Sequence, residues 1–183
     1  MIDWNRLPKP LDDGLCDHLE GMRIPVVELP ATDGSQVDLH RLSQTRLVLF
    51  FYPLTADAQG NVPLGWDQIA GARGCTPQIC AYREQASVFD RYGASLYGVS
   101  TQSTAYQREM KNRLHAPFDF LSDSELRLAT ALRLPTFQVD QATLLKRLTL
   151  ILEQGVIVKC FYPVFPPDQD INNVINWLQT NDH

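Results

Sequence analysis

Two of the four cysteines lie close together, and their type and spacing suggest chemistry. Cys75 and Cys80 are five positions apart and follow a glycine-rich stretch, whereas Cys16 and Cys160 stand alone. In a reducing compartment, a close pair of this kind is typically reactive or metal-binding rather than structural. Four-cysteine zinc sites use two short-spaced pairs, and this chain has no second pair. We therefore expect redox chemistry at Cys75 and Cys80, with no metal and no other cofactor.

Cys75 begins a segment with the periodicity of an α-helix. Apolar residues recur at three- and four-residue steps as far as Tyr92, and Gly93 closes the segment. Pro77 lies in the first turn, where its missing N–H costs nothing. At about 100° per residue, Cys75 lies with the apolar face and Cys80 with the polar face. A thiol at a helix N-terminus is close to the positive end of the helix dipole and to unpaired N–H groups, and both favour the thiolate.

The spacing restricts how the two sulfurs can react with each other. Residues five apart in an intact helix have Cα atoms about 8.6 Å apart, whereas a disulfide needs less than about 7 Å. A bond between Cys75 and Cys80 therefore requires the first turns of the helix to unwind. Full ionisation of a thiol increases the reactive fraction by at most about 30-fold. Further acceleration must come from groups that position a substrate and stabilise its leaving group.

Each cysteine also has a simpler interpretation, as a small apolar side chain. We expect Cys160 to pack within a strand and Cys16 to be exposed without a role. For Cys75 and Cys80, the long glycine-rich loop at residues 54–74 favours a functional interpretation, because loops of that length in compact domains tend to be functional.

The elements around the cysteine pair alternate between strand and helix. Helices between strands imply parallel neighbours in a central sheet, and a late hairpin adds antiparallel strands. The prediction is an α/β fold with a central mixed sheet flanked by helices and an N-terminal hairpin extension. In chain order, we expect a hairpin at 26–39, a strand at 46–52, a helix at 75–92, a strand at 95–100, a helix at 103–114, a strand at 118–121, a helix from a capping box at 122–125 to 133, a hairpin at 147–162 and a helix from 168.

The length and composition indicate one ordinary globular domain. The chain has 183 residues, 44% of them apolar, and a net charge of −5. Residues 1–20 are polar and irregular and are expected to form an arm before a single domain at 21–183. Because there is no block of Lys and Arg, no long apolar run and no secretory signal pattern, we expect a cytoplasmic protein that binds neither nucleic acid nor a membrane.

The residues around the pair resemble a known family. The segments Phe51-Tyr52-Pro53, Gly74-Cys75-Thr76-Pro77-Gln78-Ile79-Cys80 and Tyr82-Arg83-Glu84 resemble the peroxiredoxin Q (bacterioferritin comigratory protein) class of peroxiredoxins, in the alkyl hydroperoxide reductase and thiol-specific antioxidant superfamily. The resemblance runs from about Ile24 to Leu178 and includes the order of elements of the family's thioredoxin-like fold.

The resemblance implies roles for three residues. Cys75 would be the peroxidatic cysteine, which attacks a peroxide and becomes a sulfenic acid. Cys80 would be the resolving cysteine, which condenses with that acid to a disulfide. Arg147 opens a strand and would hold the thiolate and bind the peroxide, because a guanidinium is always charged and offers several donors.

The sequence departs from the family pattern before the peroxidatic cysteine. The proline and the hydroxyl residue that the family places seven and three positions earlier are replaced by Gln68 and Ala72. Pro53 lies 22 residues before Cys75 (75 − 53), so an insertion interrupts the motif. It either shapes or covers the pocket mouth, or is a surface loop anchored by Trp66. We assign the substrate site to Pro53, Thr55 and Gly74, with Thr55 folding back to supply the hydroxyl.

These residues predict a thiol-dependent peroxidase that reduces hydrogen peroxide and organic hydroperoxides through a Cys75–Cys80 disulfide. By resemblance, thioredoxin or a similar dithiol would recycle the enzyme, and the protein would be a monomer or weak dimer. Two alternatives remain open: a thioredoxin-like dithiol-disulfide oxidoreductase, and a redox-sensing protein with weak peroxidase activity.

Overall fold

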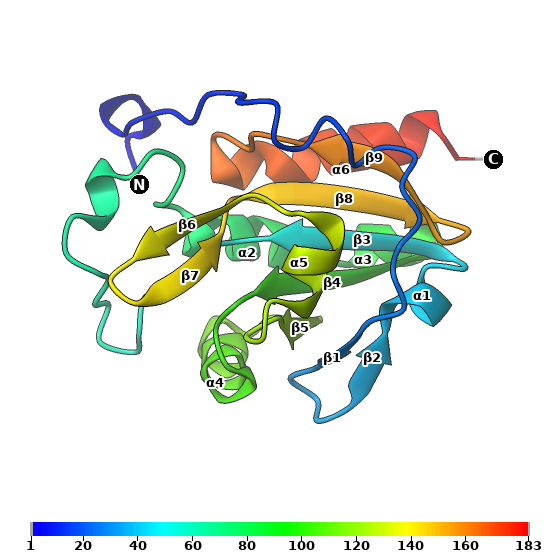
Figure 1. The fold of residues 1–183 in the computed structure, drawn as a ribbon, viewed down its shortest axis with the longest axis horizontal. Coiled ribbons are helices and arrows are strands. Elements are labelled where there is room, and N and C mark those ends of the chain that lie inside the picture. Colours follow the sequence, from blue (N-terminus) through cyan, green and yellow to red (C-terminus); the bar gives the residue numbers. More distant parts are fainter. Residues whose placement is uncertain (1, 183) are drawn as a thin grey trace.

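A five-stranded mixed sheet forms the centre of the computed structural model, which describes residues 2–182 (Figure 1). Strand β3 is parallel to β4, and β4 is parallel to β5, while β8 is antiparallel to both β3 and β9. Across the sheet, the order is β5 (Asp119–Ser122), β4 (Ala94–Ser100), β3 (Arg46–Phe51), β8 (Leu148–Glu153) and β9 (Val156–Phe161).

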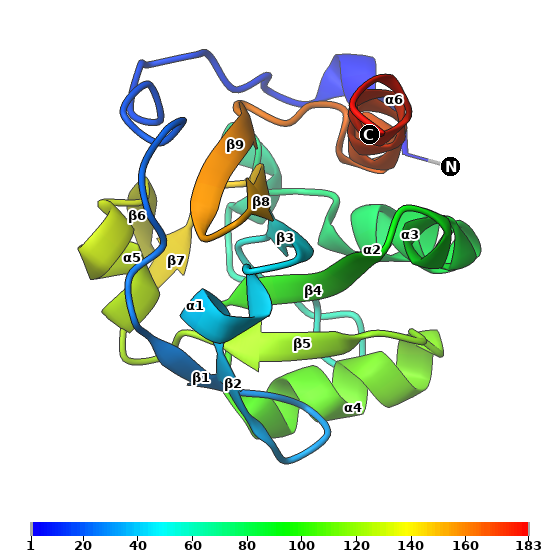
Figure 2. The same ribbon diagram turned by 90° about the vertical axis from the view of Figure 1, so that its right-hand side faces the viewer.

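Both faces of this sheet are covered, as Figure 2 shows with the strands between two layers. One layer, which we call the α2 face, contains α2 (Cys75–Glu84), α3 (Ser87–Arg91), α4 (Thr104–Leu114) and α6 (Asp170–Thr180). The other, which we call the α5 face, contains the N-terminal segment, α1 (Leu39–Leu42), α5 (Arg127–Leu132) and the strand β1 (Glu28–Pro30), which pairs with β2 (Gln36–Asp38).

The central strand β3 is apolar because it packs on both faces. Leu47 and Leu49 belong to the core of the α5 face, and Val48 and Phe50 belong to the core of the α2 face. All four side chains are fully buried. A continuous apolar run is the expected pattern for a strand covered on both sides. The predicted α/β fold with its mixed sheet and N-terminal hairpin is therefore confirmed.

Several predicted boundaries are wrong. The helix predicted at 75–92 ends at Glu84, because Gln85 and Ala86 make tighter i→i−3 backbone bonds before α3 begins. Leu39 is the first residue of α1 rather than a strand residue, because Asp38 caps that helix. The final helix begins at Asp170, after the 3₁₀ turn Pro167–Gln169.

The predicted capping box at 122–125 is also wrong. Leu126 has φ 57°, a left-handed conformation, and helix α5 begins only at Arg127. The carboxylate of Asp123 reaches forward to accept the N–H groups of Leu128 (3.0 Å) and Ala129 (2.8 Å). A hairpin that we did not predict follows α5, formed by β6 (Thr136–Val139) and β7 (Ala142–Leu145).

The N-terminal segment follows the molecular surface and is not loose. It includes the 3₁₀ turn Trp4–Arg6, and Leu19 is fully buried in the core of the α5 face. Cys16 is 6% exposed, so the expectation that it is exposed is wrong. The division into an arm at 1–20 and a domain at 21–183 stays a prediction. No helix among residues 2–182 combines the length and apolar character needed to span a membrane.

Gly98 is required where β4 crosses the aromatic core. A Cβ at this position would lie 2.5 Å from Cδ1 of Phe120 and 2.7 Å from Cζ of Phe50. We therefore expect Gly98→Ala to lower the free energy of unfolding by about 1–3 kcal/mol, because the buried rings must shift. Urea unfolding measures this, with Ser95→Ala in the same strand as the control. Equal stability of the two variants would contradict the packing described here.

Candidate active site

Cys75 is the first residue of α2 and lies in the core rather than on the surface. Its side chain is 3% exposed, and its thiol points back to the carbonyl oxygen of Ala72, 3.7 Å away. The apolar face of α2 carries Cys75 inward, whereas Cys80 is half-buried on the same helix. The predicted facing of the two thiols is thus confirmed, although α2 is shorter than predicted.

Gly74 allows α2 to begin at this place. Its φ is 114°, a backbone conformation that L-residues rarely adopt. A Cβ would also lie 2.7 Å from Cγ of Pro167 and 2.8 Å from Cη2 of Trp4. The helix N-terminus is therefore packed closely between the N-terminal segment and the 3₁₀ turn before α6.

Arg147 is the charged group beside the thiol. It lies just before β8, is 4% exposed, and its Nη2 is 3.3 Å from Sγ of Cys75. The same nitrogen donates to the carbonyl oxygens of Ala72 at 3.0 Å and Gly71 at 3.3 Å. Arg147 therefore places a cationic hydrogen-bond donor directly beside the sulfur of Cys75.

A buried amide connects Arg147 to a buried carboxylate. Nη1 of Arg147 donates to Oε1 of Gln78, and Nε2 of Gln78 donates to Oδ2 of Asp170 at 2.9 Å. That oxygen also accepts the hydroxyl groups of Tyr82 (2.8 Å) and Thr149 (2.7 Å). Gln78 thus holds the guanidinium in place while its own amide is fixed from the other side.

The carboxylate of Asp170 is costly to bury. Burial raises the pKa of Asp170 above its ordinary value, and the hydrogen bonds from Thr149, Gln78 and Tyr82 and the charge of Arg147 oppose this effect. Its second oxygen, Oδ1, has no hydrogen-bond partner among the described residues, and neither does Nε of Arg147. Arg147 and Asp170 carry opposite charges and both contact the Gln78 amide between them. Each charge therefore lowers the free-energy cost of burying the other.

An open hollow of about 570 Å³ gives access to this region. Its wall includes Cys75, Thr76 and Pro77 of α2, and Thr55 from the loop after β3. Thr55 is 1% exposed, so it is held within the wall rather than at the surface. The structure thus brings Cys75, Gly74 and Thr55 together around one hollow. Pro53 is buried and is not part of this wall.

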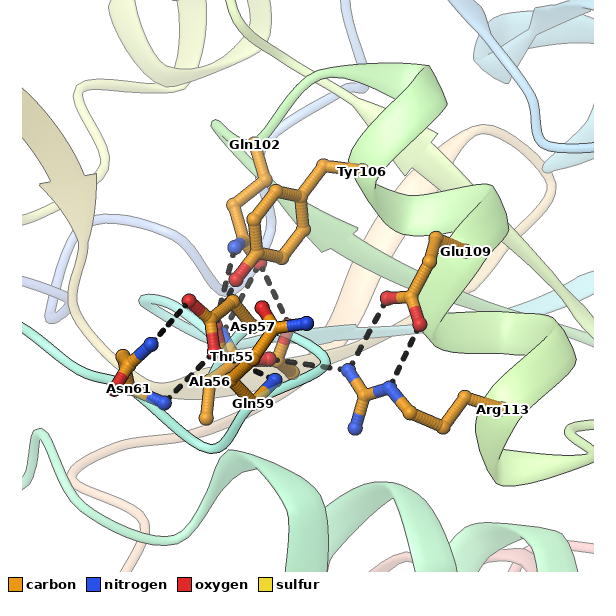
Figure 3. A network of polar contacts seen from close by, with 9 residues as sticks. All are labelled: Thr55, Ala56, Asp57, Gln59, Asn61, Gln102, Tyr106, Glu109 and Arg113. Carbon is orange, nitrogen blue, oxygen red and sulfur yellow. Dashed lines mark hydrogen bonds and ion pairs between the residues drawn. The ribbon is translucent and has the colours of Figure 1, made fainter.

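The loop that carries Thr55 is fixed by residues near the start of α4 (Figure 3). Gln102 Oε1 accepts both the backbone N–H of Thr55 (3.1 Å) and its hydroxyl (3.2 Å), and the Tyr106 hydroxyl donates to the Thr55 carbonyl (2.8 Å). Arg113 donates to the carbonyl of Ala56 (3.1 Å) and pairs with Glu109 (2.9 Å).

The next turn of the loop is held by its own side chains. Asp57 accepts the backbone N–H groups of Gln59 (2.9 Å) and Asn61 (2.8 Å), and the Asn61 side chain donates to it at 2.9 Å. This part of the loop has a definite conformation.

The predicted insertion at 54–74 is part of the wall as well as an anchored loop. Trp66 is 2% exposed and packs with Ala72 and the unpredicted β6–β7 hairpin, with its ring 6.3 Å from that of Phe137. Trp66 and Val62 also line the hollow that contains Cys75. Both interpretations of the insertion are therefore correct.

Sequence reasoning did not identify Gln78, Gln102, Tyr106 or Asp170. Gln78 had a sequence signal, because a residue three positions after Cys75 in a helix lies on nearly the same face. Asp170 and Gln102 have none, since only the folded chain brings them to the site. The described residues contain no group of three His, Cys, Asp or Glu side chains arranged for a metal ion.

The mixed sheet, with a cysteine at a helix N-terminus beside a buried arginine, defines a thiol-based redox protein of thioredoxin-like fold. The chain belongs to the redoxin family, whose sequence model matches residues 19–176. This confirms the predicted redox class and covers nearly the whole chain.

Curated relatives carry a more specific name. The chain is 29% identical over 162 residues to a peroxiredoxin Q of Oryza sativa subsp. japonica, which covers 88% of this chain and 67% of that protein. It is 23% identical to a "putative peroxiredoxin bcp" of Coxiella burnetii, over 86% of this chain and 97% of that protein. The predicted resemblance to the peroxiredoxin Q class is confirmed. These relatives support a thiol peroxidase and not the alternative of a dithiol-disulfide oxidoreductase or redox sensor.

Solved structures agree on the fold. The peroxidoxin BcpB of Mycobacterium tuberculosis superposes with a TM-score of 0.74 at 22% identity, over 91% of this chain and all of the other. A peroxiredoxin Q of Xanthomonas campestris superposes with a TM-score of 0.72 at 22% identity, over 91% of this chain and 98% of the other.

The raised pKa of Asp170 gives a testable pH dependence. A carboxyl with a higher pKa in the folded state binds its proton more tightly when folded. The free energy of unfolding therefore falls as pH rises through the folded pKa. Asp170→Asn cannot titrate. We expect the wild type to gain stability relative to this variant as pH falls from about 7 to about 4, by about 1.4 kcal/mol for each unit of the shift.

Urea unfolding at a series of pH values measures this difference. The control is Asp90→Asn, which removes an exposed carboxylate from α3 and should give a curve parallel to that of the wild type. A stability difference between wild type and Asp170→Asn that does not change with pH would show that Asp170 is not buried at a cost.

Proposed function

We propose that this protein reduces hydrogen peroxide and organic hydroperoxides with Cys75 as the peroxidatic cysteine, Cys80 as the resolving cysteine and Arg147 as the residue that activates the thiol and binds peroxide. The observation that carries the proposal is the 3.3 Å contact between Nη2 of Arg147 and Sγ of Cys75 beside an open hollow. A lone buried thiol would have neither a cation nor access to a substrate.

The first step is a displacement at oxygen. The Cys75 thiolate attacks one peroxide oxygen, the S–O bond forms, and the O–O bond breaks. The alkoxide or hydroxide that leaves takes up a proton, and Cys75 becomes a sulfenic acid. Arg147 stabilises the thiolate before the attack and the negative charge on the departing oxygen during it.

Thr55 supplies the hydroxyl that the family motif places near the cysteine. In this chain, Ala72 occupies the motif position, and its carbonyl oxygen faces Arg147 and Cys75 instead. Thr55 reaches the same hollow from the loop after β3, held by Gln102. Its hydroxyl would orient a bound peroxide from the wall of this hollow. The volume of about 570 Å³ leaves room for an organic hydroperoxide.

The second step requires α2 to open. Cys75 and Cys80 lie in one continuous helix, and their Cα atoms must approach to within about 7 Å to form a disulfide. Unwinding would separate Gln78 from both Arg147 and Asp170, and would move Gly74 away from Trp4 and Pro167. In the closed helix Arg147 is positioned for peroxide reduction, and in the open helix Cys80 reaches the sulfenic acid. Condensation then releases water.

A dithiol such as thioredoxin would reduce the Cys75–Cys80 disulfide. Cys80 is half-buried on the outer side of α2, so its sulfur is the more accessible of the two to a partner thiolate. Attack there forms a mixed disulfide with Cys80 and releases Cys75 as a thiolate. The expected monomeric or weakly dimeric state belongs to this proposal as well.

Peroxide consumption coupled to thioredoxin, thioredoxin reductase and NADPH tests these assignments. We expect Cys75→Ser to abolish turnover, and Cys80→Ser to consume about one equivalent of peroxide and then stop, because resolution is lost. Ser87→Ala, which changes an exposed residue of α3, is the control and should match the wild type. Sustained turnover by Cys75→Ser would refute the proposal, as would reduction of insulin disulfides by wild type that consumes no peroxide.

Amide hydrogen exchange tests the opening of α2. We expect residues 75–83 to lose protection in the oxidised protein relative to the reduced protein, because a disulfide and an intact helix are incompatible there. Helix α6 is the internal control and should be protected similarly in both states. Equal protection of 75–83 in the two states would exclude this route to the disulfide.

A further inference from the structure

A second pair of thiols lies on the face of the sheet opposite Cys75. Cys16 and Cys160 are 144 positions apart in sequence (160 − 16), yet both pack in the core of the α5 face and line one surface hollow. Both cysteines are free; Cys16 is buried and Cys160 is half-buried, and both side chains line this same hollow. Figures 1 and 2 show the N-terminal segment running along β9, which carries Cys160.

Polar contacts hold the two segments together close to the pair. Oε1 of Glu20 accepts both Nζ of Lys159 (2.8 Å) and the backbone N–H of Cys160 (3.0 Å). The hydroxyl of Tyr162 donates to Asp13 at 2.8 Å. These contacts lie on both sides of each cysteine in sequence, so the two sulfurs remain neighbours when other parts of the N-terminal segment move.

The sheet separates this pair from the peroxidase site. Cys160 pairs with Leu150 of β8, and both side chains lie on the α5 face, whereas Cys75 belongs to the core of the α2 face. Neither Cys16 nor Cys160 lines the hollow that contains Cys75. The pair therefore cannot resolve a Cys75 sulfenic acid within one molecule.

We propose that Cys16 and Cys160 form a second redox-active dithiol, which a hydroperoxide converts into a disulfide that joins the N-terminal segment to strand β9 without the participation of Cys75. The sulfur of Cys160, as its thiolate, attacks one peroxide oxygen, so that the S–O bond forms and the O–O bond breaks. The alkoxide or hydroxide that leaves is protonated to an alcohol or to water, and Cys160 becomes a sulfenic acid. The Cys16 thiol then displaces hydroxide from that sulfur, the S–S bond forms, and water is released. Two electrons pass from the two sulfurs to one peroxide.

The surroundings assign different roles to the two sulfurs. The hydrogen bond with Cys160, burial and the charge of Asp13 raise the pKa of Cys16 above its ordinary value, so Cys16 remains a protonated thiol. Cys160 is half-buried at the hollow and is the sulfur that peroxide can reach. Asp12, Asp17 and Glu20 also line this hollow, whereas Cys75 has the guanidinium of Arg147 beside it, so we expect this dithiol to be oxidised more slowly than Cys75.

The disulfide would fix a segment that touches the peroxidase site. Upstream of Cys16, Pro10 packs against Gly71 and Trp4 packs against Gly74, the residue before Cys75. Oxidation would therefore limit how far this segment can leave the N-terminus of α2. Closing a long loop also restricts the unfolded chain, which stabilises the folded protein.

Peptide mapping tests the proposal directly. The reduced full-length protein is treated with excess hydrogen peroxide, alkylated and digested with trypsin. Cys16 then falls in residues 7–23 and Cys160 in residues 160–183, whereas Cys75 and Cys80 share residues 74–83. We expect a disulfide-linked pair of the first two peptides in the wild type and also in Cys75→Ser, and its absence from Cys16→Ser and Cys160→Ser.

The outcome is independent of the peroxidase assignments. If Cys16 and Cys160 are fully alkylated while residues 74–83 carry an internal disulfide, the second dithiol is refuted and the peroxidase proposal stands. A cross-link that forms in the wild type but not in Cys75→Ser would refute its independence from Cys75. If the cross-link forms but residues 74–83 carry no internal disulfide, the result would support the second dithiol and not the peroxidase assignments.

Thermal unfolding provides a second readout in the Cys75→Ser, Cys80→Ser double variant, where only this pair can form. Oxidation should raise its Tm by about 5–15 °C, and addition of Cys16→Ser should remove the shift. If peptide mapping shows the cross-link in the oxidised double variant but its Tm equals that of the reduced form, the proposed restraint on the N-terminal segment is refuted.

Discussion

The buried guanidinium of Arg147 is the constraint on which the site depends. A full positive charge with 4% exposure is costly to bury unless most of its donors are hydrogen-bonded and a negative charge is near. Two backbone carbonyls, Gln78 and the sulfur of Cys75 take up its hydrogen bonds, and Asp170 supplies the opposite charge behind Gln78. In the proposed mechanism the sulfur of Cys75 is the nucleophile, so the guanidinium that is packed into the core would also act in the chemistry.

This arrangement creates a conflict between the two chemical steps. In the proposed mechanism, peroxide reduction uses Gln78 and Arg147 held by a closed α2, whereas a disulfide with Cys80 would need the first turns of that helix open. The close packing of Gly74 against Trp4 and Pro167 favours the closed state. In the proposed mechanism, oxidation of Cys75 would change the group that Arg147 contacts, which would weaken the closed state when opening is required.

The central sheet gives each pair of cysteines its own environment. Cys75 faces a cation and an open hollow on one side, and Cys16 faces acidic residues and Cys160 on the other. Cys75 packs in the core of the α2 face, whereas Cys16 and Cys160 pack in the core of the α5 face, with the sheet between them. Their reactivities differ because their neighbours differ, although the residue type is the same.

The sequence by itself determined the alternating elements, the two-sided apolar strand β3, and the position of Cys75 at a helix N-terminus facing the core, because these follow from local periodicity and turn residues. It missed the β6–β7 hairpin, the break after Glu84 and the burial of Cys16. The family resemblance predicted Arg147 beside Cys75 and Thr55 at the substrate site, but only the tertiary structure decided that Asp170 lies behind Gln78 and that Gln102 holds Thr55. These contacts join residues distant in sequence, and no local pattern encodes which distant segments pack together.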